Sequence, residues 1–83
     1  MTIEEMKEME EMEKIAEEMK KNLVEHFDYK IVCFDDQYFL DTDMLSVDKN
    51  DLKNIDSILK RHGMTLETIT IVNVGLEFEF VRE

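Results

Sequence analysis

The side chains in this sequence that could act as nucleophiles or hold a transition metal are those of Cys33, His26 and His62. A reactive cysteine needs thiolate character, which a basic neighbour or a helix N-terminus provides. Cys33 lies instead between Val32 and Phe34 in an apolar run, so we interpret it as a small core residue. One cysteine and two distant histidines also lack the closely spaced ligand pairs of a structural zinc site. The residue pattern therefore disfavours a small Cys/His enzyme or a metal-binding protein, and predicts no catalytic residue, metal or cofactor.

Carboxylates are the other groups in this sequence that could carry chemistry. Asp35 and Asp36 could form half of a carboxylate pair for hydrolysis or two-metal catalysis, although adjacent aspartates are commoner in hairpin turns. Residues 41–48 begin Asp-x-Asp, as a calcium-binding loop does, but Ser46 replaces the turn glycine and Leu52 replaces the final glutamate. The sequence has no phosphate-binding glycine loop and no nucleophile elbow. We therefore expect a protein that is not an enzyme.

Acidity is the strongest feature of the composition. The 83 residues include 21 acidic and 10 basic ones, which gives a formal net charge of −11 at pH 7. Direct binding to nucleic acid or to an anionic membrane needs clusters of Lys and Arg, so we expect neither. A partner protein with a basic surface fits this charge, and so does simple solubility. The sequence has no apolar run of about 18 residues and no basic-then-apolar leader, so we expect a cytoplasmic protein.

A long first helix is predicted over about residues 3–26. Thr2 and Glu5 have the spacing of a capping box. A heptad-like spacing relates Met9, Met12, Ala16, Met19, Leu23 and His26. About 24 helical residues would span about 36 Å, whereas a strand of about six residues spans about 20 Å. The helix should therefore overhang its sheet, and we expect the overhang to run from Met1 to about Glu13.

The rest of the chain predicts two hairpins separated by a second helix. The first hairpin has strands at 29–34 and 38–41, joined by a turn at Asp35 and Asp36. Asp48 is a predicted N-cap that forms a capping box with Asp51, and Gly63 follows the last turn of this helix.

The second hairpin covers about residues 66–82 and turns at Gly75. Its last strand alternates apolar and acidic residues, so one face should be buried and the other exposed to solvent. The predicted core residues are Phe78 and Phe80, and the predicted exposed residues are Glu77 and Glu79.

The element order is therefore α-β-β-α-β-β within a single domain over residues 1–83. Its simplest architecture is an α+β fold in which a four-stranded antiparallel sheet carries both helices on one face. The two halves resemble each other, since each has a helix ending in His followed by two strands. An internal duplication and chance both explain this resemblance.

The function expected from these features is a small, acidic protein-binding module, homodimeric through its N-terminal helix. Its contact residues would be Met6, Met9 and Met12, because methionine adapts to varied binding surfaces.

The alternative is an acidic inhibitor that mimics nucleic acid, of the kind that phages and mobile elements use against restriction or CRISPR enzymes. Residues 4–18 hold eight acids and two bases, and a row of four glutamates could imitate spaced phosphates. The row comprises Glu4, Glu8, Glu11 and Glu18, to which Asp35 and Asp36 add charge.

Overall fold

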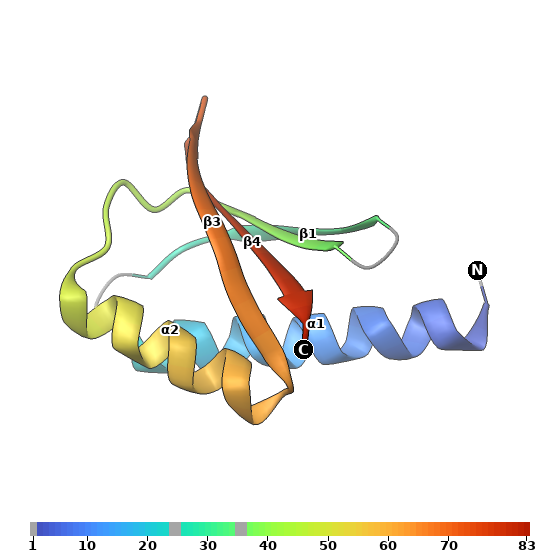
Figure 1. Ribbon diagram of the computed structural model, residues 1–83. Helices are drawn as coiled ribbons and strands as arrows, with labels where there is room; N and C mark the ends of the chain where they lie inside the picture. The colour runs from blue at the N-terminus through green and yellow to red at the C-terminus, as the bar shows by residue number, and fades with distance from the viewer. Residues whose placement is uncertain (1, 24–25, 35–36) are drawn as a thin grey trace.

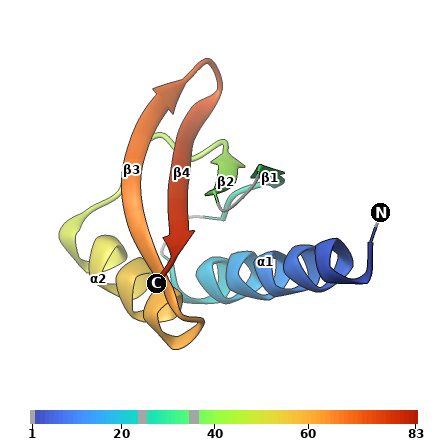
Figure 2. The same ribbon diagram turned by 45° about the vertical axis from the view of Figure 1, so that its right-hand side comes forward.

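The computed structural model describes residues 2–23, 26–34 and 37–83. These residues form two helices and four strands: α1 (Ile3–Asn22), β1 (Tyr29–Phe34), β2 (Gln37–Thr42), α2 (Lys49–Arg61), β3 (Met64–Val72) and β4 (Gly75–Arg82). Their arrangement is drawn in Figure 1. The strands form an antiparallel sheet in the order β1-β2-β4-β3. Figures 1 and 2 show both helices on one side of this sheet. The predicted element order and α+β architecture are therefore confirmed.

Helix α1 begins where the sequence predicts and ends earlier. The Thr2 hydroxyl accepts a hydrogen bond from the Glu5 amide at 3.1 Å, which caps the first turn. The last helical residue is Asn22, not residue 26, and Leu23 has an extended backbone. Leu23 and Phe27 are both buried, so the chain leaves the helix early to bring each of them into the core. His26 consequently lies outside the helix, which corrects the predicted heptad.

Helix α2 has the predicted signals at both ends. The Asp48 carboxylate accepts from the Asp51 amide at 2.8 Å, and the Asp51 side chain accepts from the Asp48 amide, so the capping box is complete. Gly63 follows the helix with a φ of 71°, a conformation that glycine adopts without strain. These contacts fix the ends of α2 over the sheet.

The core lies between the two helices and one face of the sheet. Its fully buried side chains include the predicted Phe78 and Phe80, and Leu76 is also buried. The helices and neighbouring strands contribute Met12, Ile15, Ala16, Met19, Ile55, Ile58, Leu59, Tyr38 and Leu40. Gly75 allows β4 to start against the loop after β2, since a Cβ there would lie 2.7 Å from the Asp43 Cα.

Neither helix of the described residues lies on the other face of the sheet (Figure 2). By strand alternation it presents Lys30, Val32, Phe34, Phe39, Asp41, Glu77, Glu79 and Val81. Glu77 and Glu79 point away from the core as predicted, but they are half-buried rather than fully exposed. The reason is that β4 is a central strand, so side chains of β2 and β3 stand on both sides of it.

The part of α1 that leaves the core is shorter than predicted. Met12 is fully buried, so the overhang does not extend to Glu13. Ile3 is 74% exposed and Met6 is 51% exposed, whereas Met9 is half-buried. About two turns at the start of the helix therefore extend beyond the packed part of the molecule (Figure 1).

Candidate interaction site at the start of the first helix

The candidate site is residues 3–10 of α1, which we call the N-terminal segment. Two of its apolar side chains, Ile3 and Met6, are exposed to solvent. A third, Met9, anchors the segment to the sheet, because its Sδ lies 3.5 Å from the Cys33 Sγ. Four glutamates and one lysine make the rest of the segment strongly acidic. The segment thus combines exposed apolar side chains with negative charge.

The four glutamates of the predicted acidic row have different surroundings. Glu11 Oε1 accepts from Arg82 Nη2 at 2.7 Å, and Glu18 pairs with α2, so both charges are neutralised within the chain. Glu4 is exposed and Glu8 half-buried, and neither takes part in an ion pair among the described residues. The structure therefore leaves Glu4 and Glu8 as the members of the row that are available to a partner.

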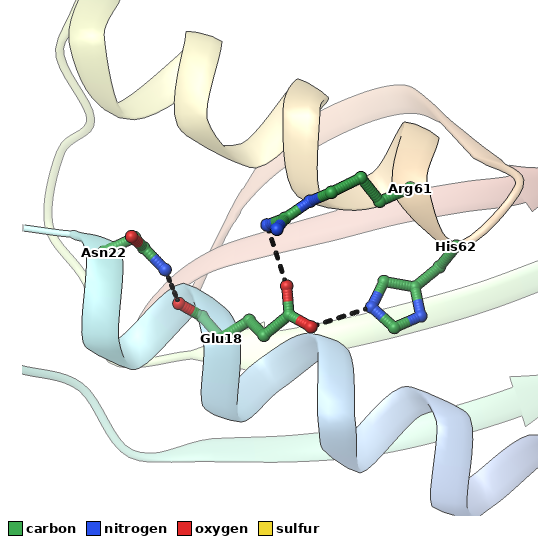
Figure 3. A network of polar contacts seen from close by, with 4 residues as sticks. All are labelled: Glu18, Asn22, Arg61 and His62. Atoms are coloured by element: carbon green, nitrogen blue, oxygen red, sulfur yellow. Dashed lines mark hydrogen bonds and ion pairs between the residues drawn. The ribbon is translucent and has the colours of Figure 1, made fainter.

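Figure 3 shows the contacts of Glu18. Its carboxylate accepts from Arg61 Nη2 at 2.9 Å and lies 3.1 Å from His62 Nε2. Its main-chain oxygen accepts from Asn22 Nδ2 at 2.7 Å. Since Arg61 and His62 lie at the end of α2, this network ties the two helices together. We assign it a structural role.

The predicted methionine contacts are not brought together on the surface. Met6 is exposed and Met9 half-buried, but Met12 belongs to the core and is not available to a partner. Asp35 and Asp36 lie outside the described residues. A helix that pairs with a second chain and a helix that packs in the protein's own core have the same apolar spacing. The heptad spacing in the sequence therefore could not distinguish these two cases.

Cys33 and the histidines do not form a reactive constellation. Burial and, to a smaller extent, the charge of Glu8 raise the pKa of the Cys33 thiol, which opposes thiolate formation. His26 is exposed, while His62 contacts Glu18. Within residues 2–23, 26–34 and 37–83, no group of three or more His, Cys, Asp or Glu residues is arranged to hold a metal ion.

An acidic pair that sequence reasoning missed lies on the helix-free face of the sheet. Asp41 and Glu77 are direct cross-strand neighbours in β2 and β4. Hydrogen bonding with Asp41, followed by burial and the charges of Asp41 and Glu79, raises the pKa of Glu77 to about 7. The pair can be recognised only from the register between β2 and β4. The alternation of apolar and acidic residues within one strand does not give that register.

The chain's fold class is that of a small α+β protein with a two-helix layer over an antiparallel sheet. Comparison with protein-family models, with curated proteins and with solved structures finds no match to this chain. Among the described residues, neither helix is both long and apolar enough to cross a membrane.

Proposed function

We propose that this protein is a non-enzymatic binding module that holds a partner protein through the N-terminal segment of α1. The supporting observation is the exposure of Ile3 and Met6 on a helical segment that leaves the core. Because the segment is part of a continuous capped helix, its side chains are presented on a helical surface. Apolar anchors on a helix face are a common means of protein recognition.

The charge of the chain favours a partner with a basic surface. The formal net charge is −11, and the N-terminal segment carries Glu4, Glu5, Glu8 and Glu10 against Lys7. Opposite charges on two proteins speed their association, and like charges disfavour binding of other partners. A basic surface with an apolar centre would complement this segment.

The expected homodimer stays a prediction, and the packing of α1 makes it the weaker proposal. Met12, Ala16 and Met19 of the heptad are fully buried in the protein's own core. Through α1, a second copy could therefore contact little more than Ile3 and Met6 among the apolar side chains, while adding the repulsion of another chain of charge −11.

The proposal is tested by replacing both exposed anchors in the variant Ile3→Gln/Met6→Gln. Partners are captured from the native host on immobilised protein, eluted in steps of salt and identified, and each purified partner is then titrated. We expect binding about tenfold or more weaker in the variant, because burial of two apolar side chains is lost.

The matched control is Leu45→Gln/Val74→Gln, which removes two other exposed apolar side chains. Leu45 is 83% exposed and Val74 is 71% exposed, and both lie outside the N-terminal segment. The control should bind as the wild type does. Equal affinity of the Ile3→Gln/Met6→Gln variant and the wild type would refute the proposed contact.

The second candidate function is competition with nucleic acid for a basic protein surface. The density of acids in residues 4–18 favours it, but the ion pairs of Glu11 and Glu18 leave only Glu4 and Glu8 of the expected row. If this function operates, Glu4→Gln/Glu8→Gln should weaken binding to a nucleic-acid-binding partner, and added nucleic acid should displace that partner.

A further inference from the structure

The two edges of the sheet differ in how open they are to an added strand. The strand order places β1 at one edge and β3 at the other. β3 has a register shift between Leu66 and Thr68 and an exposed charge at Glu67, and both features hinder strand addition. β1 keeps a regular register throughout, and Lys30 is its only charged residue. β1 is therefore the less protected edge.

The hydrogen-bond pattern identifies the free backbone groups of β1. The Asp28 carbonyl accepts from the Asp43 amide at 3.3 Å, in register with the β1–β2 pairs. Since the bonding direction alternates along an antiparallel strand, Lys30, Val32 and Phe34 direct their backbone groups toward β2. The N–H and C=O groups of Tyr29, Ile31 and Cys33 consequently face the open edge.

Helix α1 runs alongside this open edge. Its residues Met6, Met9, Glu13, Glu17 and Lys20 follow the three- and four-residue spacing of a single helix face. Met9 contacts Cys33, at the carboxyl-terminal part of β1. Tyr29, at the start of β1, donates its hydroxyl to Glu17 Oε1 at 3.0 Å. Between these contacts α1 rises about 12 Å and β1 about 13 Å, so the two axes are nearly aligned while the chain runs in opposite directions along them.

This face of α1 is acidic beside Tyr29. Burial, the hydrogen bond to Glu17 and the charges of Glu17 and Glu13 raise the pKa of the Tyr29 hydroxyl. The chain's own Lys20 lies over the Tyr29 ring, with its Nζ 5.6 Å from the ring centroid. Tyr29, Ile31 and Cys33 are themselves only half-buried.

We propose that β1 accepts an extended, basic segment of the partner protein as a fifth strand of the sheet. Such a segment would pair with the free backbone groups of Tyr29, Ile31 and Cys33. Its alternate side chains would lie over α1, where Glu13 and Glu17 are separated by about 6 Å along the helix, close to the rise of about 6.6 Å between alternate strand residues. Lys or Arg at two alternate positions of the added strand would therefore pair with Glu13 and Glu17.

The remaining side chains of the added strand would lie on the helix-free face of the sheet. Val32 is 39% exposed there and Phe34 is 65% exposed, so apolar side chains fit these positions. The segment is therefore one in which basic and apolar residues alternate. A second copy fits less well, because its β1 would bring Lys30 alone toward a chain of charge −11.

This inference rests on the proposed protein-binding function and adds a second contact surface to it. Its test uses the full chain and a short synthetic peptide in which Lys and Val alternate. Amide hydrogen exchange is followed residue by residue, with a Glu-Val peptide as the control. Without peptide, the amides of Tyr29, Ile31 and Cys33 should exchange quickly. The Lys-Val peptide should slow them about tenfold or more, and the Glu-Val peptide should not.

The charge contribution is measured with Glu13→Gln, and Glu67→Gln on the β3 edge is the matched control. Both glutamates are exposed. Glu13→Gln should weaken binding of the Lys-Val peptide about two- to fivefold, as expected for one exposed charge pair, and Glu67→Gln should leave it unchanged.

Several results would overturn the inference, and they separate it from the proposed function. Unchanged exchange at Tyr29, Ile31 and Cys33 in saturating Lys-Val peptide would exclude the added strand, while the Ile3→Gln/Met6→Gln result would still decide the N-terminal segment. Protection of the same amides that rises with protein concentration alone would identify a second copy as the occupant. Equal protection by the Glu-Val peptide would exclude a basic segment.

Discussion

The carboxyl groups of Asp41 and Glu77 form an acidic pair in which the fold raises the pKa of Glu77. They face each other across β2 and β4, with Lys30 beside Asp41 on β1, Thr70 beside Glu77 on β3, and Glu79 farther along β4. Asp41 Oδ1 is buried and has no hydrogen-bond partner among the described residues. A proton on Glu77 would supply the missing donor, which agrees with a Glu77 pKa of about 7.

This pair predicts a fold that becomes more stable as the pH falls from 8 to 5. The Glu77 pKa is higher in the folded protein than in the unfolded chain, so the stabilisation is complete below the unfolded value of 4.5 and is lost as the pH rises through about 7. Glu77→Gln keeps a donor for Asp41 and removes the titration. At pH 8 we expect this variant to exceed the wild type in unfolding free energy by about 1–2 kcal/mol.

Urea unfolding at several pH values measures this difference, which should shrink toward zero at pH 5. Acidification also relieves general repulsion among the acids, so Glu67→Gln serves as the control that removes one exposed charge without touching the pair. A wild type and a Glu77→Gln variant with parallel pH profiles would show that Glu77 does not hold the proton.

Single-residue environments were only partly predictable from the sequence. Alternation correctly placed Phe78 and Phe80 in the core and turned Glu77 outward. It could not reveal that Asp41 stands opposite Glu77, because strand order and register come from tertiary pairing. The acidic pair therefore became visible only in the folded structure.

The two helices are capped in similar ways but differ in how their first turns are supported. Asp48 caps a turn that contains the buried Asp51, whereas Thr2 caps a turn that is exposed throughout. Asp48→Ala should therefore lower the global unfolding free energy by about 1 kcal/mol, a typical cost for a lost cap. Thr2→Ala should change it much less, since the first turn of α1 can open while the core stays folded.

Urea unfolding gives the global effect of each cap, and amide exchange in the first turn of α1 gives the local one. Thr2→Ala should speed exchange of the Glu5 amide, because this amide donates a hydrogen bond to the Thr2 hydroxyl in the wild type. Equal losses of global stability in the two variants would mean that both first turns unfold with the core.

At the scale of elements, the starts of the helices were easier to predict than the end of α1. The starts depend on local side-chain hydrogen bonds, which a capping-box spacing records in the sequence. The end at Asn22 depends on where Leu23 and Phe27 reach the core, and this is a tertiary constraint. The predicted helix was too long for this reason.

The whole molecule has an approximately two-fold arrangement about its central strands. The strand order β1-β2-β4-β3 places one hairpin on each side of the antiparallel contact between β2 and β4. Figure 1 shows the helices running in opposite directions beneath the sheet. α1 has 20 residues and α2 has 13, so the main departure of the helices from this arrangement is the extra length at the start of α1. The N-terminal segment is close to this extra length.

The sequence predicted that the start of α1 would extend beyond the sheet, but not where the exposed segment ends. Comparing helix length with strand length correctly indicated that α1 outruns the sheet, because both follow from the rise per residue. The packing of Met12 and the ion pair between Glu11 and Arg82 depend on the position of β4, so the sequence could not place the end of the exposed segment. The open β1 edge was likewise absent from the sequence pattern, since it follows from strand order.

Truncation separates the exposed part of α1 from the part that belongs to the fold. A chain that starts at Met9 loses Ile3 and Met6 but keeps the contact with Cys33 and the buried Met12. We expect its unfolding free energy to fall by no more than about 1 kcal/mol, the cost of the lost cap, and its partner binding to weaken about tenfold or more, as in the Ile3→Gln/Met6→Gln variant. A chain that starts at Glu13 loses Met12 as well, and a buried methionine contributes about 2–5 kcal/mol, so it should be severely destabilised. Urea unfolding and partner titration on both chains measure these effects. If the chain that starts at Met9 binds its partner normally, the N-terminal segment is not the contact, and if this chain unfolds, the segment is part of the folding unit.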